Sequence, residues 1–300
     1  MIEDLISKAI VESESIAPHL AVYGDKAAVF YQQAAHDKDV RWKGRQYPRL
    51  DYVIDWQYNA ERKAEGTMLI NLWCTNEDEP PENIGLIISN ELSGLFVTDE
   101  TGTYSLLWNR TDGFDVAGSE PQMYGVTITF DVIAFPIQFN NGGETKFGYP
   151  DPVLSICRYT KKLFPQSYVL GIDDMPEILR PSDESPVIFY RINNVSSAMR
   201  NQYAVAWMNA SIIGHYIAPS TNKRLMLLKT ITERLALDGD VIMDDGSPMR
   251  LVNPLSYSMA NNPITVGQLT VTGQYGVLRE YEDVEPIKSI YINGKEQSNG

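Results

Sequence analysis

The order strand, strand, helix, strand, strand occurs twice in this 300-residue sequence, and this repetition constrains its fold more than any other feature. The first copy runs from Tyr47 to Pro136, and the second runs from Ser185 to about Arg279. The two copies align with an offset of 138 at their first proline (186 − 48 = 138) and of 143 at their last strand (269 − 126 = 143). The match is one of pattern rather than identity. Two unrelated domains could produce it by chance, and we favour a duplication.

Hydrophobic alternation defines the first copy. Residues 50–58 and 124–132 alternate apolar with polar side chains, as strands with one buried face do. Residues 67–74 are apolar on both faces, which predicts a central strand. Acids and prolines precede a helix over 82–92 that ends at Ser93-Gly94, and a short strand follows over 104–108.

These patterns predict an α+β fold of two similar domains, each a mainly antiparallel sheet packed against amphipathic helices. Residues 139–150 are rich in turn formers, so we expect domains over 1–140 and 141–285 and a polar tail over 286–300. Residues 279–300 as a whole are polar and acidic, which favours partial disorder.

Other stretches give further expectations. Apolar spacing predicts helices over 2–17, over 153–164 and after Pro219, the last capped by Ser220 or Thr221. Strands are expected over 187–192, 203–217 and 249–252, and a long one over 264–278. Irregular or polar connections are expected over 166–185, over 193–202 and from Asp238.

The formal net charge is −14, which argues against simple binding to nucleic acid or to an anionic membrane. The charge is uneven along the chain. Residues 1–150 carry 11 Lys and Arg and 23 Asp and Glu (11 − 23 = −12), and residues 151–300 carry 14 and 16 (14 − 16 = −2). We therefore expect the two domains to present different surfaces to partners.

The remaining composition predicts an intracellular protein. Cys74 and Cys157 lie in apolar patterns and are interpreted as buried thiols. The sequence holds no apolar run of membrane-spanning length, and the acidic start Met1-Ile-Glu-Asp-Leu5 lacks the basic residues of a signal peptide. A reducing cytoplasm is the expected place of synthesis.

No pattern predicts catalysis, a cofactor or a metal. The three histidines, His19, His36 and His215, have no zinc-ligand spacing, and no phosphate-binding or serine-nucleophile motif is present. Residues 36–39 can be drawn as a metal or acid-base cluster, but a polar hairpin loop explains them. Residues 238–246 alternate acids as a calcium loop does, without its central glycine and final glutamate, and are interpreted as turns around a short strand.

One basic stretch is a candidate subunit-contact arm. Residues 32–49 are polar, and the candidate contact residues are Arg41, Trp42, Lys43 and Arg45. The simplest interpretation, which we favour, is a solvated hairpin arm. The sharper alternative is an arm that reaches an acidic neighbour, such as another copy of this chain.

The first 138 or so residues resemble the tail terminator, or tail completion, proteins of long-tailed bacteriophages. The resemblance rests on the N-terminal amphipathic helix, the hairpin of Tyr52–Trp56 and Met68–Trp73, the acidic-led helix 82–92 and the strand Tyr124–Val132. Members of that family are typically single domains, whereas this chain carries two.

The resemblance implies a structural virion protein with no catalytic residues. Such a protein forms a ring at the head-proximal end of the tail, caps the tail tube and joins it to the head-tail connector. Six-fold symmetry would come from three chains, or from six chains with the second domain as a collar. DNA would only pass through the lumen, which the acidic first half could line. Assembly would take place in the host bacterial cytoplasm, away from any membrane. Alternatives are another neck, collar, connector or baseplate component, or a small-molecule binding module.

Overall fold

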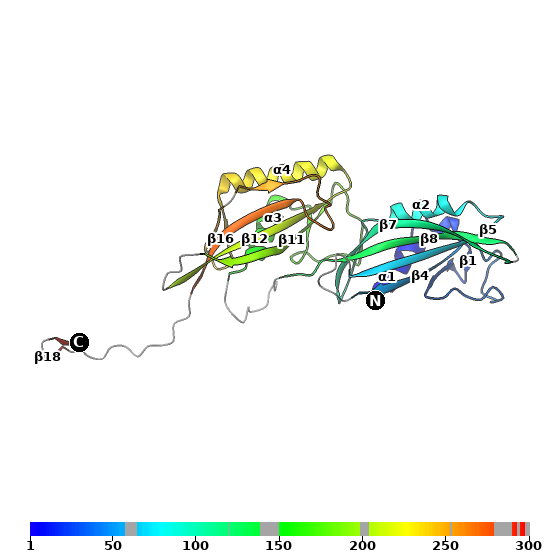
Figure 1. Ribbon diagram of the computed structural model, residues 1–300, viewed down its shortest axis with the longest axis horizontal. Coiled ribbons are helices and arrows are strands. Elements are labelled where there is room, and N and C mark those ends of the chain that lie inside the picture. Colours follow the sequence, from blue (N-terminus) through cyan, green and yellow to red (C-terminus); the bar gives the residue numbers. More distant parts are fainter. Residues whose placement is uncertain are drawn as a thin grey trace.

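In the computed structural model the chain forms two domains that lie end to end along the long axis of the molecule (Figure 1). The structure describes residues 1–57, 65–119, 121–138, 150–198, 204–252 and 254–278, and the backbone of 290–292 and 295–297. The predicted boundary at residue 140 and most of the predicted polar tail lie outside the described residues. No helix in the described part of the chain is long and apolar enough to cross a membrane.

The first domain contains two helices and a seven-stranded sheet. The sheet order is β10-β6-β7-β8-β5-β4-β3, and only β3 runs parallel to its neighbour β4. The elements are α1 (Ile2–Val11), the 3₁₀ turn η1 (Ala17–His19), the small hairpin β1 (Val22–Tyr23) and β2 (Lys26–Ala27), β3 (Val29–Tyr31), β4 (Arg49–Trp56), β5 (Gly66–Thr75), α2 (Pro81–Leu92), β6 (Phe96–Asp99), β7 (Gly102–Val116) and β8 (Met123–Ala134).

The second domain contains two further helices and a sheet in the order β13-β14-β16-β12-β11-β9, with the short β15 also on β16. Only β9 runs parallel to its neighbour β11. The elements are α3 (Pro152–Leu163), β9 (Tyr168–Val169), β10 (Ile178–Leu179), β11 (Val187–Ser197), β12 (Val205–Ile217), α4 (Thr221–Asp238), β13 (Asp240–Ile242), β14 (Pro248–Leu251), β15 (Ser256–Tyr257) and β16 (Leu269–Leu278). A separate hairpin, β17 (Ile290–Ile292) with β18 (Lys295–Gln297), follows.

The two domains share one topology. Reading each from its first helix, α1, β3, β4, β5, α2, β6, β7 and β8 correspond in order to α3, β9, β11, β12, α4, β13, β14 and β16. The sheet orders then coincide strand for strand, including the parallel pair at one edge. The prediction of two similar α+β domains with mainly antiparallel sheets is confirmed.

Local signals fix the helix ends. Asp151 caps α3, because its carboxylate accepts hydrogen bonds from the Val153 and Leu154 amides, and Pro152 occupies the first turn. Ser220 caps α4 by accepting from the Lys223 amide at 3.0 Å, so the choice between Ser220 and Thr221 falls on the serine. Gly239 ends α4 with φ of 72°, a left-handed conformation that favours glycine.

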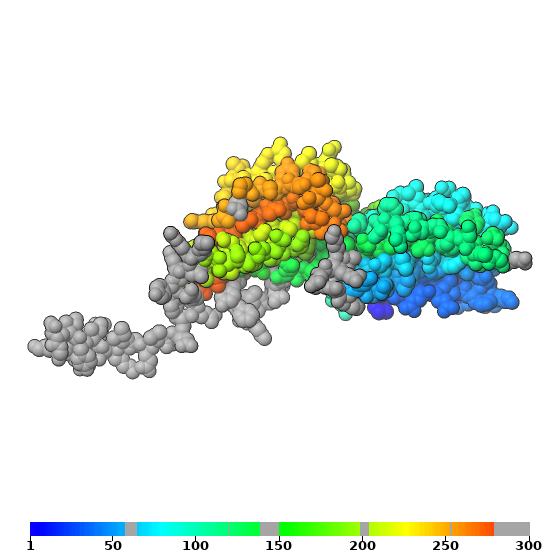
Figure 2. Space-filling view, in the orientation of Figure 1, coloured from blue at the N-terminus to red at the C-terminus, as the bar shows by residue number. Residues whose placement is uncertain are grey.

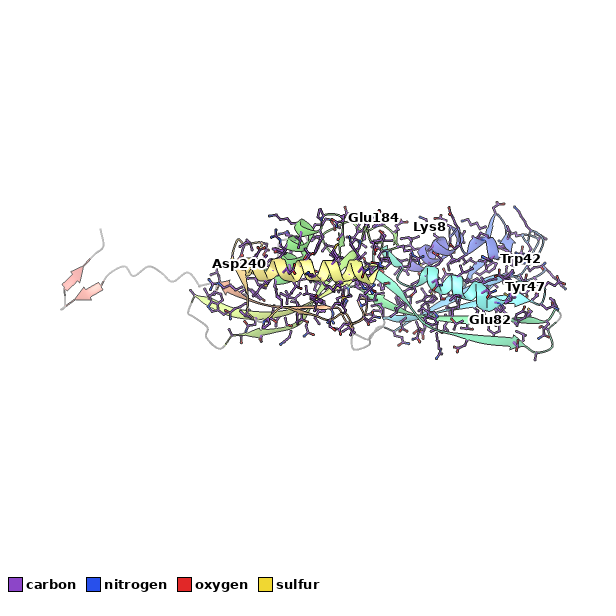
Figure 3. The ribbon with its side chains drawn as sticks, turned by 90° about the horizontal axis from the view of Figure 1, so that it is seen from above. Lys8, Trp42, Tyr47, Glu82, Glu184 and Asp240 are labelled. Atoms are coloured by element: carbon purple, nitrogen blue, oxygen red, sulfur yellow. The ribbon has the colours of Figure 1, made fainter. Side chains whose placement is uncertain are left out.

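Each domain covers one face of its sheet with helices and leaves most of the other face open, except that Phe189 and His215 on the outward face of the second sheet are buried at the domain contact. The inward side chains of β4, β5 and β8 pack with α1 and α2 into one core, and those of β11, β12 and β16 pack with α3 and α4 into another. The helices of both domains lie on the same side of the sheets (Figure 3). The open sheet faces form most of the surface toward the viewer in Figure 2.

Several predicted boundaries are wrong. The first helix ends at Val11 rather than near Pro18, since Ser13 accepts from the Ile16 amide and turns the chain into η1. The strand expected over 104–108 is the 15-residue β7, whose exposed outer half carries no apolar alternation. The 264–278 strand begins only at Leu269, and β11 extends to Ser197 into the expected connection.

The connection expected to be irregular over 166–185 contributes strands to both sheets. β9 joins the second sheet, whereas β10 pairs antiparallel with β6 of the first, with Ile178 opposite Val97 and Leu179 opposite Phe96. Around this crossing lies a third apolar cluster, contributed by both domains: Phe96, Ile133, Phe135, Leu170, Val187, Phe189, Ile217 and Ile264. A continuous apolar contact therefore joins the two domains.

Candidate functional site

The candidate contact arm folds back on the first domain around Trp42. The Trp42 ring packs edge-on against Tyr23 and Phe30, with ring centroids 4.9 and 5.9 Å apart, and its Nε1 donates to the His36 carbonyl oxygen at 3.0 Å. Trp42 also forms an isolated bridge with Tyr23 of β1. The tryptophan therefore anchors the arm, and the basic residues around it occupy the surface.

Each of the three basic contact residues of the arm has an acidic partner within the chain. Arg41 binds Asp39 through two nitrogens, at 3.1 and 2.8 Å, and lies over the Tyr23 ring. Lys43 pairs with Asp25 at 2.5 Å, and Arg45 pairs with Asp78 at 3.5 Å. The Arg41 guanidinium and the Tyr23 hydroxyl hold the pKa of Asp39 well below its usual range. The arm is a locally neutralised surface rather than a free basic patch.

The open face of the first sheet carries two polar rows that run across the strands. In one row Asp51 opposes Asn71, which opposes Thr127, and hydrogen bonds of 2.9 and 2.8 Å link the three side chains. Trp73 also donates to Asp51. This row is locked in place by its own contacts.

In the second row Asp55 opposes Thr67, which opposes Asp131. Asn109 donates to Asp131 at 3.0 Å. Asp55 is exposed. The open face of the first domain therefore presents carboxylates to solvent.

The corresponding face of the second domain carries fewer carboxylates. The charged outward side chains on its described strands are Arg191 of β11, Arg250 of β14 and Asp240 of β13, which lies opposite Arg250, and polar side chains such as Asn209 and Gln274, bonded at 3.1 Å, fill the space between. The two open faces thus differ in charge, as the two halves of the sequence do.

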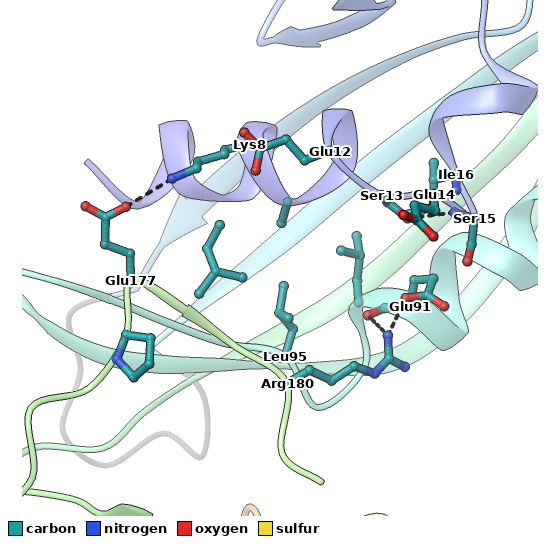
Figure 4. A pocket seen from close by; sticks show the side chains of 14 residues that line it. Lys8, Glu12, Ser13, Glu14, Ser15, Ile16, Glu91, Leu95, Glu177 and Arg180 are labelled. Atoms are coloured by element: carbon teal, nitrogen blue, oxygen red, sulfur yellow. Dashed lines mark hydrogen bonds and ion pairs between the residues drawn. The ribbon is translucent and has the colours of Figure 1, made fainter. Parts of the chain in front are cut away.

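A groove in the first domain lies between α1, the end of α2 and β10, and it encloses about 620 Å³ (Figure 4). Lys8 of α1 pairs with Glu177 at 3.3 Å across this groove. Arg180 donates to the carbonyl oxygens of Asn90 and Glu91 at 2.7 and 2.9 Å and binds the Glu91 carboxylate. The strand β10 is therefore held by an ion pair on each side, and Arg180 caps the C-terminus of α2.

The histidines lie apart from one another. His19 binds Glu79 at 2.9 Å, and His36 accepts from the Lys38 amide at 3.1 Å. His215 is buried under the domain contact, between Phe135 and Phe189. Within the described ranges no group of three or more His, Cys, Asp or Glu side chains is arranged to hold a metal ion.

Both cysteines are buried free thiols, as predicted, and burial raises the pKa of the Cys74 thiol to about 12. The acidic stretch 238–246 does not converge on one point. Asp240 begins strand β13, Asp238 accepts from Tyr159, and Asp245 accepts from the amide and hydroxyl of Ser247. The predicted turns around a short strand are confirmed.

Sequence reasoning identified the arm but missed its acidic partners and the whole of β10. The Asp39–Arg41 pair could have been found from its two-residue spacing, whereas nothing local marks Ile178 and Leu179 as a strand of the other domain. No protein-family model matches the sequence, and a search of curated proteins finds no similar protein.

Proposed function

We propose that this chain is a structural protein of a bacteriophage particle that forms a ring at the head-proximal end of the tail. In this role it caps the tail tube and joins it to the head-tail connector, and it has no catalytic task. The observation that carries the proposal is the tandem of two α+β units with one topology, the first of which has the element order that resembles tail terminators.

Two features of the surface support an assembly role. Both domains keep their helices on one side, so the chain offers a long open sheet face to a neighbouring structure (Figure 2). The acidic part of this face, with Asp55 and Asp131, would line the lumen, where repulsion between carboxylates and phosphates lets DNA pass without being held. The two halves would then divide the tasks of facing DNA and facing protein.

Light scattering after size-exclusion chromatography, followed by mixing with the tail tube protein of the same virus, tests the proposal. We expect closed rings of three or six chains and tubes that stop growing once the rings bind. A related neck, collar or baseplate component would form rings that leave tube growth unchanged. A persistent monomer that binds a small ligand would contradict the proposal.

A further inference from the structure

The edge strand β6 of the first domain is covered by β10 of the same chain. Ile178 and Leu179 extend the sheet by one strand, and the Thr98 amide donates to the Glu177 carbonyl oxygen at 2.9 Å. The ion pairs of Glu177 with Lys8 and of Arg180 with Glu91 hold both ends of this added strand. The connection between β9 and β11 thus reaches out of its own domain to complete the sheet of another.

The equivalent edge of the second domain is β13, and it ends the sheet in the described part of the chain. Val241 of β13 faces the core as Val97 of β6 does. Beside β13 lies a groove of about 530 Å³ between α3 and the end of α4. The two grooves correspond, because an offset of 150 (158 − 8 = 150) carries Lys8, Ala9 and Glu12 onto residues that line the second groove: Arg158, Tyr159 and Lys162.

The side chains around β13 are those of an uncovered surface. Ile242 is 62% exposed and Leu237 is 76% exposed, although both are large and apolar. Arg158, at the position of Lys8, is exposed and has no ion-pair partner among the residues that the structure describes. This edge has the features of the first one without its covering strand.

The equivalent of the covering segment is the candidate contact arm. Ile178 stands nine residues before β11 (187 − 178 = 9), and the residue nine before β4 is Val40 (49 − 40 = 9). Val40 is 96% exposed. The same count puts Asp39 at the position of Glu177. In both segments, Asp39–Arg41 and Glu177–Arg180, an acidic residue is followed by an aliphatic residue and then, within two residues, by an arginine.

The arm and the free edge lie toward opposite ends of the molecule. Trp42 marks the arm at one end in Figure 3, and Asp240 marks β13 at the other, with the contact between the domains in the middle. A second copy placed in line would bring its arm to β13 and repeat the contact that already exists inside each chain.

We propose that copies of this chain join head to tail, with residues 39–42 of one copy added as a strand to β13 of the next. Val40 lies opposite Val241, as Ile178 lies opposite Val97, Asp39 pairs with Arg158, and Arg41 approaches Asp238. The inference deepens the proposed ring function, since it names the contact that such a ring would use, and it rests on the self-association which that function requires. A head-to-tail contact of this kind closes into a ring when its rotation allows.

The contact between copies is more polar than the one within the chain. An offset of 138 carries Val187 and Phe189 of the apolar domain contact onto Arg49 and Asp51 (187 − 138 = 49; 189 − 138 = 51). Asp39 and Arg41 are bound to each other in the single chain and exchange partners on docking. Association therefore weakens as salt concentration rises.

Two blocked variants test the inference. The arm variant V40D places a carboxylate against the apolar side chains of the edge strand, and the edge variant carries R158E and I242D. All three positions are exposed, so both variants should keep the fold, and circular dichroism is the check. Each variant alone is expected to associate at least ~10-fold more weakly than the wild type, because one desolvated charge contact commonly changes affinity by that factor. Leu86→Asp, an exposed aliphatic residue on α2, is the control and keeps wild-type association.

Mixing the two variants gives the sharpest result. The intact arm of the edge variant fits the intact edge of the arm variant, so the mixture should form a one-to-one dimer and nothing larger by light scattering. Variants that assemble as the wild type does, or a wild type that stays monomeric at every concentration, would overturn the inference. If rings cap tubes but ignore these substitutions, only the inference fails. If chains associate through arm and edge but never affect tubes, only the proposed ring function fails.

Discussion

His215 has both ring nitrogens in hydrogen bonds inside the protein. Arg191 Nε donates to Nε2 at 3.1 Å, and Nδ1 donates to the Pro263 carbonyl oxygen at 2.8 Å. This pattern requires the neutral ring, because a protonated Nε2 could not accept from the guanidinium. Burial, with help from Arg191, lowers the pKa of His215 to about 4.

The first prediction is a loss of stability in mild acid. Below about pH 6.5 His215 becomes protonated in the unfolded chain, whereas in the folded chain it stays neutral until about pH 4. The free energy of unfolding therefore falls as the pH is lowered through this window. Between pH 7.5 and 5.0 this linkage is worth about 2 kcal/mol. Urea unfolding at the two pH values measures it. His215→Asn keeps a donor to Pro263 and should remove most of the difference in the free energy of unfolding between the two pH values. An equal difference in the wild type and the variant would refute the assignment.

Arg180 gives a second prediction at this scale. Its guanidinium joins β10 to the last carbonyl groups of α2, whose partial negative charge favours a cation. Arg180→Ala should destabilise the first domain by about 1 kcal/mol, since the side chain is half exposed and its ion pair is screened. Hydrogen exchange should quicken at the Ser93 and Gly94 amides. Arg180→Lys keeps the charge but lacks the planar guanidinium, so its stability and exchange rates should lie between those of the wild type and Arg180→Ala. Unchanged exchange in Arg180→Ala would remove the capping role.

At the scale of elements, the sequence predicts those helices and strands whose apolar residues recur at a regular spacing. The alternation in β4, β5 and β8 and the three-and-four spacing in α2, α3 and α4 lead to elements at nearly the expected positions. The outer half of β7 was missed because both its faces are solvated, which removes alternation. β10 was missed because it is two residues long and its partner β6 lies about 80 positions away in the sequence (178 − 97 = 81).

The same limit applies to the candidate site. Charge pattern alone selected Arg41, Trp42, Lys43 and Arg45 as an arm, and they do form a surface segment anchored by the tryptophan. The proposed receiving edge at β13 could not be predicted, because its openness depends on which edge the distant β10 covers. The uncovered edge at β13 is recognised only when the two folded domains are compared, so no local sequence pattern marks it.

A third prediction concerns β10 as an element. Leu179 packs into the apolar cluster between the domains, so Leu179→Asp places a carboxylate there and should cost about 2 kcal/mol. The domains should then move more freely, which small-angle scattering would record as a broader distribution of interatomic distances. Ile242→Asp, at an edge with no covering strand, is the matched control at low protein concentration. An unchanged distribution in the Leu179 variant would mean that β10 does not hold the domains together.

For the whole molecule, the separation of charge along one surface decides which part can face DNA. The open face of the first domain carries Asp55 and Asp131, whereas Arg191, Arg250 and Asp240 lie on the second. A lumen lined by the first domain repels phosphates over a distance set by the ionic strength. A lumen lined by the second would repel them less. The orientation of the chain in a ring therefore has a measurable electrostatic consequence.

The fourth prediction follows from this orientation. Asp55→Lys with Asp131→Lys changes the charge of each chain by +4 on the open face of the first domain, outside the arm and the β13 edge. Assembled rings of this variant should retain double-stranded DNA in a filter-binding assay at low salt and release it as salt rises, because bound phosphates displace counterions. Wild-type rings should not retain it. A second pair of lysines, Thr270→Lys with Thr272→Lys on β16, changes the charge of the other face by +2 per chain and should leave DNA retention low. If that pair retains DNA and the first does not, the second domain lines the channel, and the assignment of the acidic face to the lumen is wrong.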